Sequence, residues 1–479
     1  MIVQASLLSE DEKHRIHAKS LKILAQVGVK ITSDAPLRLL EAHGARVDWD
    51  ARLARIPETL VHRALETIPK RLTLGARNPR YAFDMPAPLS AYSLDGTGTY
   101  ALDFDSGERR YGTRSDIERG ARIFQAMETG VMAWPPTCAS DAPPASRVLH
   151  EFITLLKFTS KHCEHELHNP QEVPYLIEAL RLILGSEAAI RQQKIVSVTY
   201  CPVAPLVHEG PMCEAYLKLL EYDVPILVLP MPAPGTTAPA SLYASLCQAN
   251  AEALSSLVIF QCARPGSPQI YGSAAGAVDF RSGNFLEGAP EMVLQTAAMA
   301  EMARFYNLPS AAAGCLTDAK TPGPDAVLEK LLTTLPLVLT GVDIIEGLGE
   351  IESSQTLVLE QLVVDDEIAR LCRRVRQGVD CSPEKDFTAD LAKFGPGGNF
   401  LAARNTLKAP RSGEFYLPCL IERSTYEGWL SLARPDVYTK ARDIVSGILS
   451  APLVDPLPEA VSQALDDLLA EADEHLARL

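Results

Sequence analysis

Residues 308–368 read LPSAAAGCLTDAKTPGPDAVLEKLLTTLPLVLTGVDIIEGLGEIESSQTLVLEQLVVDDEI. A small-residue apolar run, SAAAGC, stops at a polar segment that contains two prolines. Residues 326–340 then repeat apolar side chains at helical spacing, with Asp325 at the N-cap position and Gly341 after the last turn. Residues 342–346 are apolar apart from Asp343 and Glu346 and are followed by glycines, which is typical of a buried parallel strand followed by a loop. The stretch therefore predicts one βαβ unit.

Similar strand-like runs recur along the chain from about residue 132. They are VMAWPPT, HCEHELH, IVSVTYC, PILVLPM, PQIYGSA, SAAAGC, VDIIEG and GGNFLAA. Most are separated by roughly thirty to forty residues, the length that a strand, a helix and two loops need. No GxxxxGK[ST] or convincing GxGxxG follows any of them, whereas an open doubly wound sheet usually has such a phosphate loop. Eight units predict an α/β fold, a (β/α)8 barrel of the TIM type.

The two ends of the chain predict additions to this barrel. Residues 10–26, 34–43 and 57–68 have helical patterns, and a polar segment with glycine turns predicts a hairpin that ends at Thr113. Residues 426–433, 436–449 and 458–479 are helical again. We therefore expect an N-terminal region over 1–120, a catalytic barrel over 121–410, and C-terminal helices over 411–479 that pack on the barrel or at a subunit interface. A homo-oligomer follows as an expectation.

Composition limits the possible partners. The chain has 479 residues, 47% of them hydrophobic, and a net charge of −15, which disfavours nucleic acids and anionic membranes and favours a small cation. No apolar stretch is long enough for a signal peptide or a membrane span. The ten cysteines are scattered without a CxxC, as expected for free thiols in the cytoplasm.

Polar and aromatic residues at the predicted strand ends form a candidate site, because barrel enzymes keep their chemistry there. We predict Glu346 and Glu350 as the catalytic carboxylates. The predicted substrate-binding residues at these ends are Trp134, Asn169, Tyr200, Tyr271 and Asn399. Aromatic faces and carboxylates together suit a quaternary ammonium group. Either tyrosine could instead be a packing residue, and either glutamate could be a charge at a helix N-terminus.

The run KHCEHELH offers a metal site as an alternative. If it is a strand, His162, Glu164, Glu166 and His168 share one face. Of these, His162, Glu164 and His168 are the weak zinc-ligand alternative. The spacing matches no closed zinc motif, so a polar barrel layer with surface histidines is the default and no metal is predicted.

Several long blocks resemble one family. They are HAKSLKILAQVGVKI, SGERRYGTRSDIERGARI, LPMPAPGTTAPASLYASLCQANAEALSSLVIFQCARPGSPQIYGS and EGLGEIESSQTLVLEQLVVDDEIA. Together they resemble the trimethylamine methyltransferase superfamily, in its branch that lacks pyrrolysine and is similar to glycine betaine:corrinoid methyltransferase. The resemblance covers nearly the whole chain.

This resemblance implies an enzyme that moves a methyl group from a methylated amine to the cobalt(I) of a corrinoid. The chain has no DxHxxG motif, so a separate carrier protein is expected to bring that cofactor. The pyrrolysine of other members falls near Ser354 and Gln355, where this chain has ordinary residues, which favours a quaternary amine such as a betaine. Asn405 stands where relatives often carry a histidine before TL. The resemblance thus adds Ser354, Gln355 and Asn405 to the substrate-binding candidates.

Other functions remain open from the sequence. A zinc-dependent methyltransferase could activate a thiol or an alcohol through the histidine cluster. The methyl acceptor could be a folate instead of a corrinoid protein. A barrel that binds a quaternary amine without turnover is the third possibility, and the asparagine at position 405 is the only sequence feature that suggests it.

Overall fold

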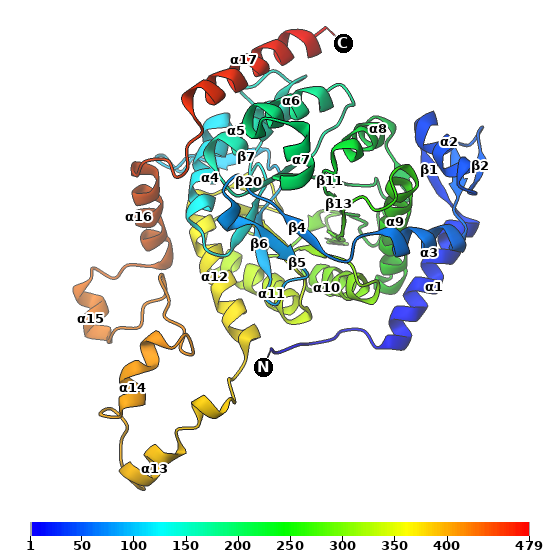
Figure 1. Cartoon of the computed structure of the whole chain (residues 1–479). Coiled ribbons are helices and arrows are strands. Elements are labelled where there is room, and N and C mark those ends of the chain that lie inside the picture. The colour runs from blue at the N-terminus through cyan, green and yellow to red at the C-terminus, as the bar shows by residue number, and fades with distance from the viewer. Residues whose placement is uncertain (1, 479) are drawn as a thin grey trace.

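Eight parallel strands form a closed barrel in the computed structural model, which describes residues 2–478 (Figure 1). Their order around the barrel is their order in the chain: β6 (Ala91–Leu94), β9 (Gly130–Ala133), β10 (His162–His165), β11 (Val196–Tyr200), β13 (Ile226–Val228), β14 (Gln269–Tyr271), β17 (Ala311–Ala313) and β18 (Ile344–Leu348). A parallel bridge between Tyr271 and Ser310 joins β14 to the start of β17. The predicted (β/α)8 barrel is confirmed.

A helix follows each barrel strand and covers its outer side. These helices are α4 (Arg114–Ala126), α5 (Arg147–Phe158), α6 (Val173–Leu184), α8 (Gly210–Leu219), α9 (Leu242–Ala263), α10 (Pro290–Phe305), α11 (Pro324–Thr340) and α12 (Leu359–Gln377). The strands are buried on both faces, so they read as continuous apolar runs. Of the helices in residues 2–478, none combines the length and hydrophobicity that crossing a bilayer requires.

The structure corrects the sequence prediction at two barrel strands. The first strand, β6, comes from the segment predicted as a polar hairpin, so the barrel begins before residue 121. The run GGNFLAA is no strand: residues 397–403 lie outside the sheet, in a loop that ends at a short helix. The strand AYSL is only four residues long and lies beside several turn signals, which explains why its pattern resembled a hairpin.

The N-terminal segment packs on the side of the barrel and across the N-terminal ends of the barrel strands. The predicted helices are confirmed as α1 (Glu10–Gln26), α2 (Asp34–Ala42) and α3 (Glu58–Thr67), and all three contact α9. The small sheet β12 (Val207–His208), β1 (Val29–Ile31), β3 (Leu53–Arg55), β2 (Arg46–Asp48) ties this segment to the barrel. The hairpin of β4 (Leu72–Leu74) and β5 (Phe83–Met85) crosses the N-terminal end of the barrel (Figure 1).

Short strands complete the loops at the opposite end. The strands are β7 (Tyr100–Leu102), β8 (Arg109–Tyr111), β15 (Ala277–Val278), β16 (Phe285–Leu286), β19 (Glu350–Ile351) and β20 (Thr356–Leu357). β19, β20, β7 and β8 form one sheet, so the predicted hairpin before Thr113 exists as β7 and β8. The remaining helix of the barrel, α7 (Glu187–Gln193), follows α6.

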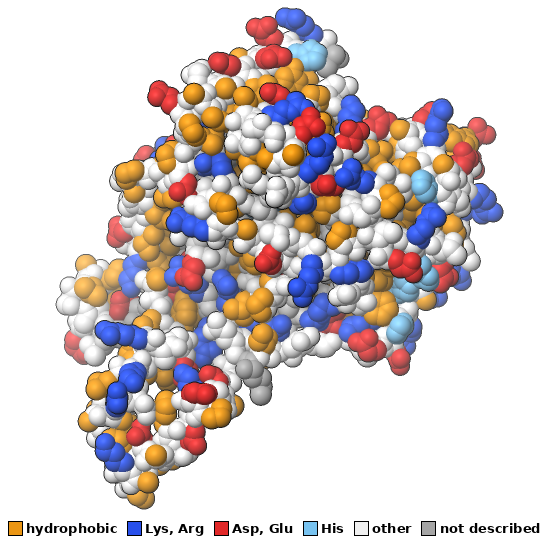
Figure 2. Space-filling model, viewed as in Figure 1, with side chains coloured by type: hydrophobic (Ala, Val, Ile, Leu, Met, Phe, Trp, Pro, Cys, Tyr) orange, Lys and Arg blue, Asp and Glu red, His pale blue; other side chains and the backbone are white. Residues whose placement is uncertain are grey.

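The C-terminal segment combines two helices that pack on the barrel with a projecting arm. α16 (Val437–Ser450) contacts α12 and α4, and α17 (Glu459–Leu476) contacts α6 and α5. Residues 379–435, which we call the arm, carry α13 (Thr388–Phe394), α14 (Arg404–Lys408) and α15 (Tyr426–Ser431) and extend away from the barrel (Figure 1). Hydrophobic side chains are spread over the arm among charged ones (Figure 2).

A buried ion pair fixes the helix that organises the C-terminal end of the barrel. α11 begins at Pro324 after Gly323, so Asp325 lies in its first turn and the N-cap prediction is wrong, whereas Gly341 ends the helix as predicted. From α11, the Lys330 ammonium lies 2.9 Å from the Asp365 carboxylate, and both side chains are fully buried. The same ammonium donates to the carbonyls of Cys315 and Gly347. It therefore holds the ends of β17 and β18 against α11.

Replacing Asp365 by asparagine should destabilise the protein strongly, because the Lys330 charge would stay buried without its partner. We expect a loss of about 3–5 kcal/mol in the free energy of unfolding, measured by urea denaturation. The matched control is Glu178→Gln, which removes one carboxylate from the exposed Arg181 pairs and should cost about 0–1 kcal/mol. Equal urea midpoints for the two variants would contradict this role of the pair.

Candidate active site

The register of the sheet decides which side chains face the barrel interior. Paired residues on neighbouring parallel strands point to the same face. His162 pairs with Met132, Glu164 with Ser197, and Glu346 with Ser93 and Ala313. Since the side-chain period of a strand is two, Trp134 and Thr199 face the same way as Met132 and Ser197. The interior therefore changes from apolar and histidine side chains near the N-terminal ends of the strands to carboxylates near their C-terminal ends.

Seven carboxyl groups gather at this end of the barrel, and we call them the acid cluster. They come from six strand ends or loops: Asp95 after β6, Glu164 and Glu166 at the end of β10, Glu287 after β16, Asp318 after β17, Glu346 in β18 and Glu350 in β19. The negative charge of Asp95 raises the pKa of Glu287, Glu346 and Glu350, so Asp95 interacts with three other members. A cluster of this kind needs protons or a cation to be stable.

Glu346 is the member with the least support from the protein. Its side chain lies in the barrel interior and the residue is 4% exposed. Neither carboxylate oxygen has a hydrogen-bond partner within residues 2–478. Burial, followed by the negative charges of Glu164 and Asp95, raises the pKa of Glu346 well above its ordinary value. A buried carboxylate without donors is costly, so this group is either protonated or paired with a cation.

Glu164 faces Glu346 from β10 and is partly satisfied. The Thr199 hydroxyl donates to its Oε1 at 2.8 Å, whereas Oε2 has no partner in the described chain. Burial raises the pKa of Glu164 to about 8. Next to it, the Cys201 thiol donates to Glu166 Oε1 at 3.3 Å. The β10 side of the cluster is therefore also short of hydrogen-bond donors.

Ser354 connects the two other sides of the cluster. Its hydroxyl is hydrogen bonded both to Asp95 Oδ2, at 2.6 Å, and to Glu287 Oε2. A hydroxyl has one proton to donate, so one of these two carboxyls must carry a proton and donate it to the serine oxygen. Burial, with the nearby Asp95 charge, raises the pKa of Glu287 to about 8. This geometry requires at least one proton in the cluster, and it brings Ser354 into contact with two members of the cluster.

Glu350 lies against the loop after β6. The Gly98 amide donates to its Oε1 at 3.1 Å, and the other oxygen is unpartnered within residues 2–478. A Cβ atom at Gly98 would lie 2.7 Å from the Glu350 carboxylate, so only glycine allows this approach. Burial and the charge of Asp95 raise the pKa of Glu350 well above its ordinary value. Glu346 and Glu350 therefore lie in one cluster, as predicted.

Trp134 is the aromatic side chain that faces this end of the barrel. Its indole nitrogen donates to Thr97 Oγ1 at 3.1 Å, and the residue is 6% exposed. A Cβ atom at Gly96 would lie 2.7 Å from the ring, so the loop after β6 packs closely on the indole. Trp134 thus offers a π-face on the same side of its strand as Met132.

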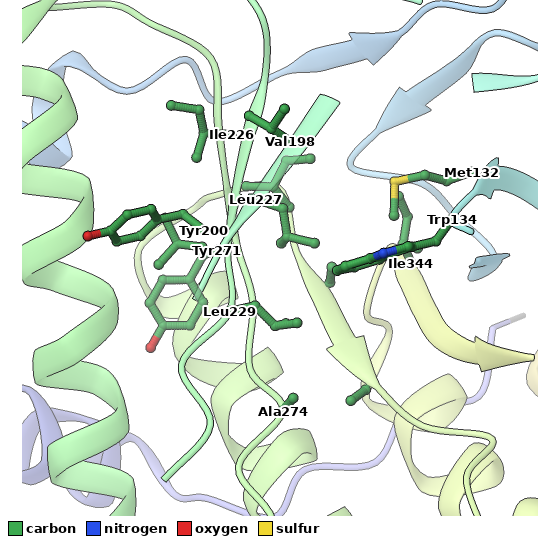
Figure 3. Close-up of a cluster of buried hydrophobic side chains, with 14 of the residues drawn as sticks. Met132, Trp134, Val198, Tyr200, Ile226, Leu227, Leu229, Tyr271, Ala274 and Ile344 are labelled. Atoms are coloured by element: carbon green, nitrogen blue, oxygen red, sulfur yellow. The ribbon is translucent and has the colours of Figure 1, made fainter. Parts of the chain in front are cut away.

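Tyr200 and Tyr271 do not face the barrel interior, and the prediction that they form the walls of a cation site is wrong. The Tyr200 hydroxyl is 2.9 Å from His208 Nδ1, and its ring packs on Phe260 of α9. The Tyr271 hydroxyl donates to Asn250 Oδ1, also on α9, at 2.6 Å. Figure 3 shows both phenol rings turned away from Trp134. These tyrosines are core residues between the sheet and its helices.

Four other predicted residues also lie apart from the acid cluster. Asn399 is exposed in the arm, and Asn405 donates to Asp390 Oδ2 within the arm. Asn169 is exposed beyond β10, where its backbone amide donates to Glu172. Gln355 is exposed next to Ser354, although its carbonyl accepts from Tyr100. The two arm residues were misplaced because GGNFLAA was taken for a barrel strand.

The proposed zinc ligands do not converge. His162 is fully buried at the bottom of the barrel, where Gly75 O and Ser197 Oγ occupy both ring nitrogens at 2.7 Å. Burial lowers its pKa to about 4. Glu164 lies two residues higher, and the side chain of His168 is 50% exposed. Among residues 2–478, no three His, Cys, Asp or Glu side chains are grouped so that they could hold a metal ion.

Two members of the cluster were missed from the sequence. Asp95 follows the unrecognised strand β6, and Glu287 follows the short strand β16 in the loop between β14 and α10. The motif SLDG around Asp95 was read as a hairpin turn, and once β6 is recognised its aspartate becomes a strand-end residue like Glu346. No local signal marks Glu287, because only the folded loop brings it to Ser354.

A cavity of about 760 Å³ opens beside the cluster. Its lining includes Asp318, Phe280 and Pro290, so it extends from the β15–β16 hairpin to the edge of the acid cluster. Phe280 is 76% exposed. The Asp318 carboxylate accepts from the amides of Glu287 and Gly288 and from the Ser353 hydroxyl. The cavity thus reaches the acid cluster at Asp318.

Comparison with known proteins gives the family. Residues 1–477 match the family model described as "Trimethylamine methyltransferase (MTTB)". The chain belongs to this family. The predicted membership is confirmed, and the chain is a methyltransferase.

Curated members of the MTTB family align over almost the full chain. MttB2, a trimethylamine methyltransferase of Methanosarcina mazei, is 31% identical over 98% of this chain and 96% of its own length. A glycine betaine methyltransferase of Desulfitobacterium hafniense is 29% identical over 92% of this chain and 91% of its own length. The solved monomethylamine methyltransferase MtmB of Methanosarcina barkeri is similar with a TM-score of 0.46, at 12% identity over 92% of this chain and 93% of that chain.

Replacing Tyr271 by phenylalanine tests the placement of the Tyr271 hydroxyl. The variant loses the hydrogen bond to Asn250, so the free energy of unfolding should fall by about 1 kcal/mol. The affinity for a quaternary ammonium ion, measured by calorimetry, should stay unchanged. A variant of unaltered stability that bound the cation at least tenfold more weakly would show that the Tyr271 hydroxyl faces the ligand and not Asn250.

Proposed function

We propose that this chain transfers a methyl group from a quaternary ammonium donor of the betaine type to the cobalt(I) of a corrinoid that a separate protein carries. The observation that supports the proposal is Glu346, a carboxylate inside the barrel with two oxygens that have no partner in the described chain. A permanent cation suits such a carboxylate, because it supplies the positive charge that would balance the buried negative charge.

The chemistry asks little of the protein beyond binding and orientation. When a quaternary nitrogen loses a methyl group it leaves as a neutral tertiary amine, so no proton has to be delivered to the leaving group. The corrinoid supplies the nucleophile for this displacement. The side chains of Glu346 and Trp134 hold the ammonium group, and the closed barrel wall fixes the direction in which the methyl group points.

The proposed donor is supported by the site and not by the degree of similarity. Relatives named for trimethylamine and for glycine betaine are 31% and 29% identical to this chain, so identity does not separate the two substrates. Near the position at which other members carry pyrrolysine, this chain has Ser354 and Gln355. Ser354 is engaged between Asp95 and Glu287. Its surroundings are acidic, which favours a positively charged donor.

The cavity beside Asp318 gives the partner's cofactor an approach. It borders the acid cluster, and Phe280 at its outer edge is exposed. A flat apolar group and an apolar rim fit one another, so residues of the β15–β16 hairpin would contact a corrinoid carrier. The chain itself supplies the substrate pocket, and the partner supplies the methyl acceptor.

Methyl transfer can be tested with free cob(I)alamin. The purified protein is mixed with the reduced cofactor and one of several donors, namely glycine betaine, longer betaines, choline, tetramethylammonium or trimethylamine, and methylation of cobalt is followed in the visible spectrum. We expect methylation with at least one quaternary amine and none with trimethylamine.

Glu346→Gln should raise KM for the active donor at least tenfold, because the variant loses the countercharge of the cation; about 2–5 kcal/mol is typical when one partner of a buried charge pair is removed. Asp390→Asn, which alters the arm contact of Asn405, is the control and should leave KM unchanged. A folded protein that methylates cobalt with none of the donors would contradict the proposed function and favour a binding barrel without turnover.

We further propose that the arm forms subunit contacts in a homo-oligomer. Its apolar side chains are unusually exposed for a single chain: Leu401 is 78%, Leu407 72% and Phe415 60% exposed. Large exposed apolar side chains on a projecting segment are typical of interaction surfaces.

Charged substitutions in the arm should dissociate the homo-oligomer. The double variant Leu401→Asp and Leu407→Asp should lower the mass measured by light scattering to that of a single chain, while the circular dichroism of the barrel stays the same. The control is Leu328→Asp on α11, which is 69% exposed outside the arm. A wild-type protein that is already a monomer would contradict the assignment.

A further inference from the structure

We propose that the acid cluster binds a permanent cation in exchange for a proton, and that Glu346 is the residue that releases it. The inference rests on the proposed function, because it assigns the quaternary ammonium group to the same site. One proton leaves the protein for each cation that binds. The O–H bond of the Glu346 carboxyl breaks, the proton goes to solvent, and the carboxylate stays behind as the counter-ion of the ammonium group.

The surroundings of Glu346 offer no hydrogen-bond donor within residues 2–478 that would stabilise its charged form. Both of its oxygens are unpartnered among residues 2–478, although backbone amides or hydroxyls satisfy one oxygen each of Glu164 and Glu350. Carboxylates are stabilised by donors or cations, and without them the neutral acid is the stable form of a buried group. The free protein therefore holds a proton on Glu346.

The charged and titratable groups around Glu346 come from every element that surrounds it. They are Asp95 after β6, Glu164 and Glu166 of β10 and its loop, Cys201 after β11, Glu287 and Asp318 from the neighbouring loops, Glu350 of β19 and Lys330 of α11. Of these groups, the negative charges of Glu164 and Asp95 act on Glu346 itself and favour its protonated form.

Lys330 does not neutralise the cluster, because its hydrogen bonds are already committed. Its ammonium group donates to Asp365 Oδ2 at 2.9 Å, to Cys315 O at 2.6 Å and to Gly347 O at 3.1 Å. A lysine has three N–H donors, and all three have acceptors. Lys330 and Asp365 form a closed pair, and a ligand has to bring the positive charge that Glu346 lacks.

A bound cation reverses the preference of Glu346 for its proton. A unit positive charge about 4 Å from a carboxylate favours the ionised form by a factor of roughly several hundred at the effective permittivity of protein sites. Since burial and like charges now raise the pKa of Glu346, the cation lowers it again. A quaternary ammonium ion has no proton of its own to give, so the proton that leaves is the one on the protein.

Two consequences distinguish this exchange from ordinary cation binding. Because protons compete with the cation, the dissociation constant should fall as the pH rises, by up to about tenfold per pH unit while Glu346 remains protonated in the free protein. A neutral molecule of the same shape cannot expel the proton. The site should therefore bind tetramethylammonium and not 3,3-dimethyl-1-butanol, whose tert-butyl group has the shape of a trimethylammonium group without its charge.

Calorimetry without any corrinoid tests the inference. Tetramethylammonium chloride is titrated into the full-length protein at one pH in phosphate and in Tris, whose ionisation enthalpies differ, and the difference in observed heat gives the number of protons released. We expect a release of about half a proton to one proton per bound cation near neutral pH, and none with 3,3-dimethyl-1-butanol.

Two variants identify the source of the proton. Glu346→Gln should bind the cation at least tenfold more weakly and release no proton. Glu252→Gln is the matched control, because Glu252 is also a buried glutamate with a pKa raised to about 7 by burial, but it lies on α9 where it accepts from the Leu206 amide. It should bind the cation and release the proton as the wild type does.

The outcomes separate this inference from the proposed function. Cation binding without buffer dependence, proton release that persists in Glu346→Gln, or no saturable binding by the wild type would each overturn the exchange. If cobalt is methylated but no proton is released, the exchange fails and the function stands. If protons are released but no donor methylates cobalt, the function fails and the exchange stands. The wild-type titration needs no variant, so misfolding of Glu346→Gln cannot hide the result.

Discussion

The structure depends on a conflict between burial and charge at the C-terminal end of the barrel. Seven carboxyl groups meet there, and Glu346 has no hydrogen-bond partner in the described chain. Such a group costs free energy unless it takes up a proton or a cation. The Ser354 hydroxyl can donate to only one of Asp95 and Glu287, so the other carboxyl group carries a proton of its own. The substrate class proposed for this methyltransferase follows from that electrostatic deficit.

The rest of the fold holds this conflict in place. The two-residue period of the strands points Glu164 and Glu346 inward, while Tyr200 and Tyr271 point outward into a core with α9. Below them, His162 and the hairpin of β4 and β5 close the barrel, so the cluster can open only toward the loops. Lys330 and Asp365 tie the ends of β17 and β18 to α11. Rigid elements thus keep like charges together that would otherwise separate.

The sequence predicted the architecture better than the site. Seven barrel strands, the flanking helices and the placement of Glu346, Glu350, Ser354 and Trp134 near one end could be predicted, because long apolar runs alternate with helical patterns and strand ends meet at one edge. The orientation of Tyr200 could not, because a strand buried on both faces shows no alternation that tells inside from outside. Asn399 and Asn405 were misplaced together with the eighth strand, and Asp95 was missed with β6. Glu287 joins the site through tertiary structure alone.

The most direct test of the account is the protonation state of Glu346, observed by difference infrared spectroscopy with and without tetramethylammonium. The account predicts that the carbonyl band of a protonated carboxyl group disappears and a carboxylate band appears when the cation binds, and that neither change occurs in Glu346→Gln. A wild-type protein in which Glu346 is ionised before the cation is added, or in which the carboxyl band is unchanged after binding, would contradict it.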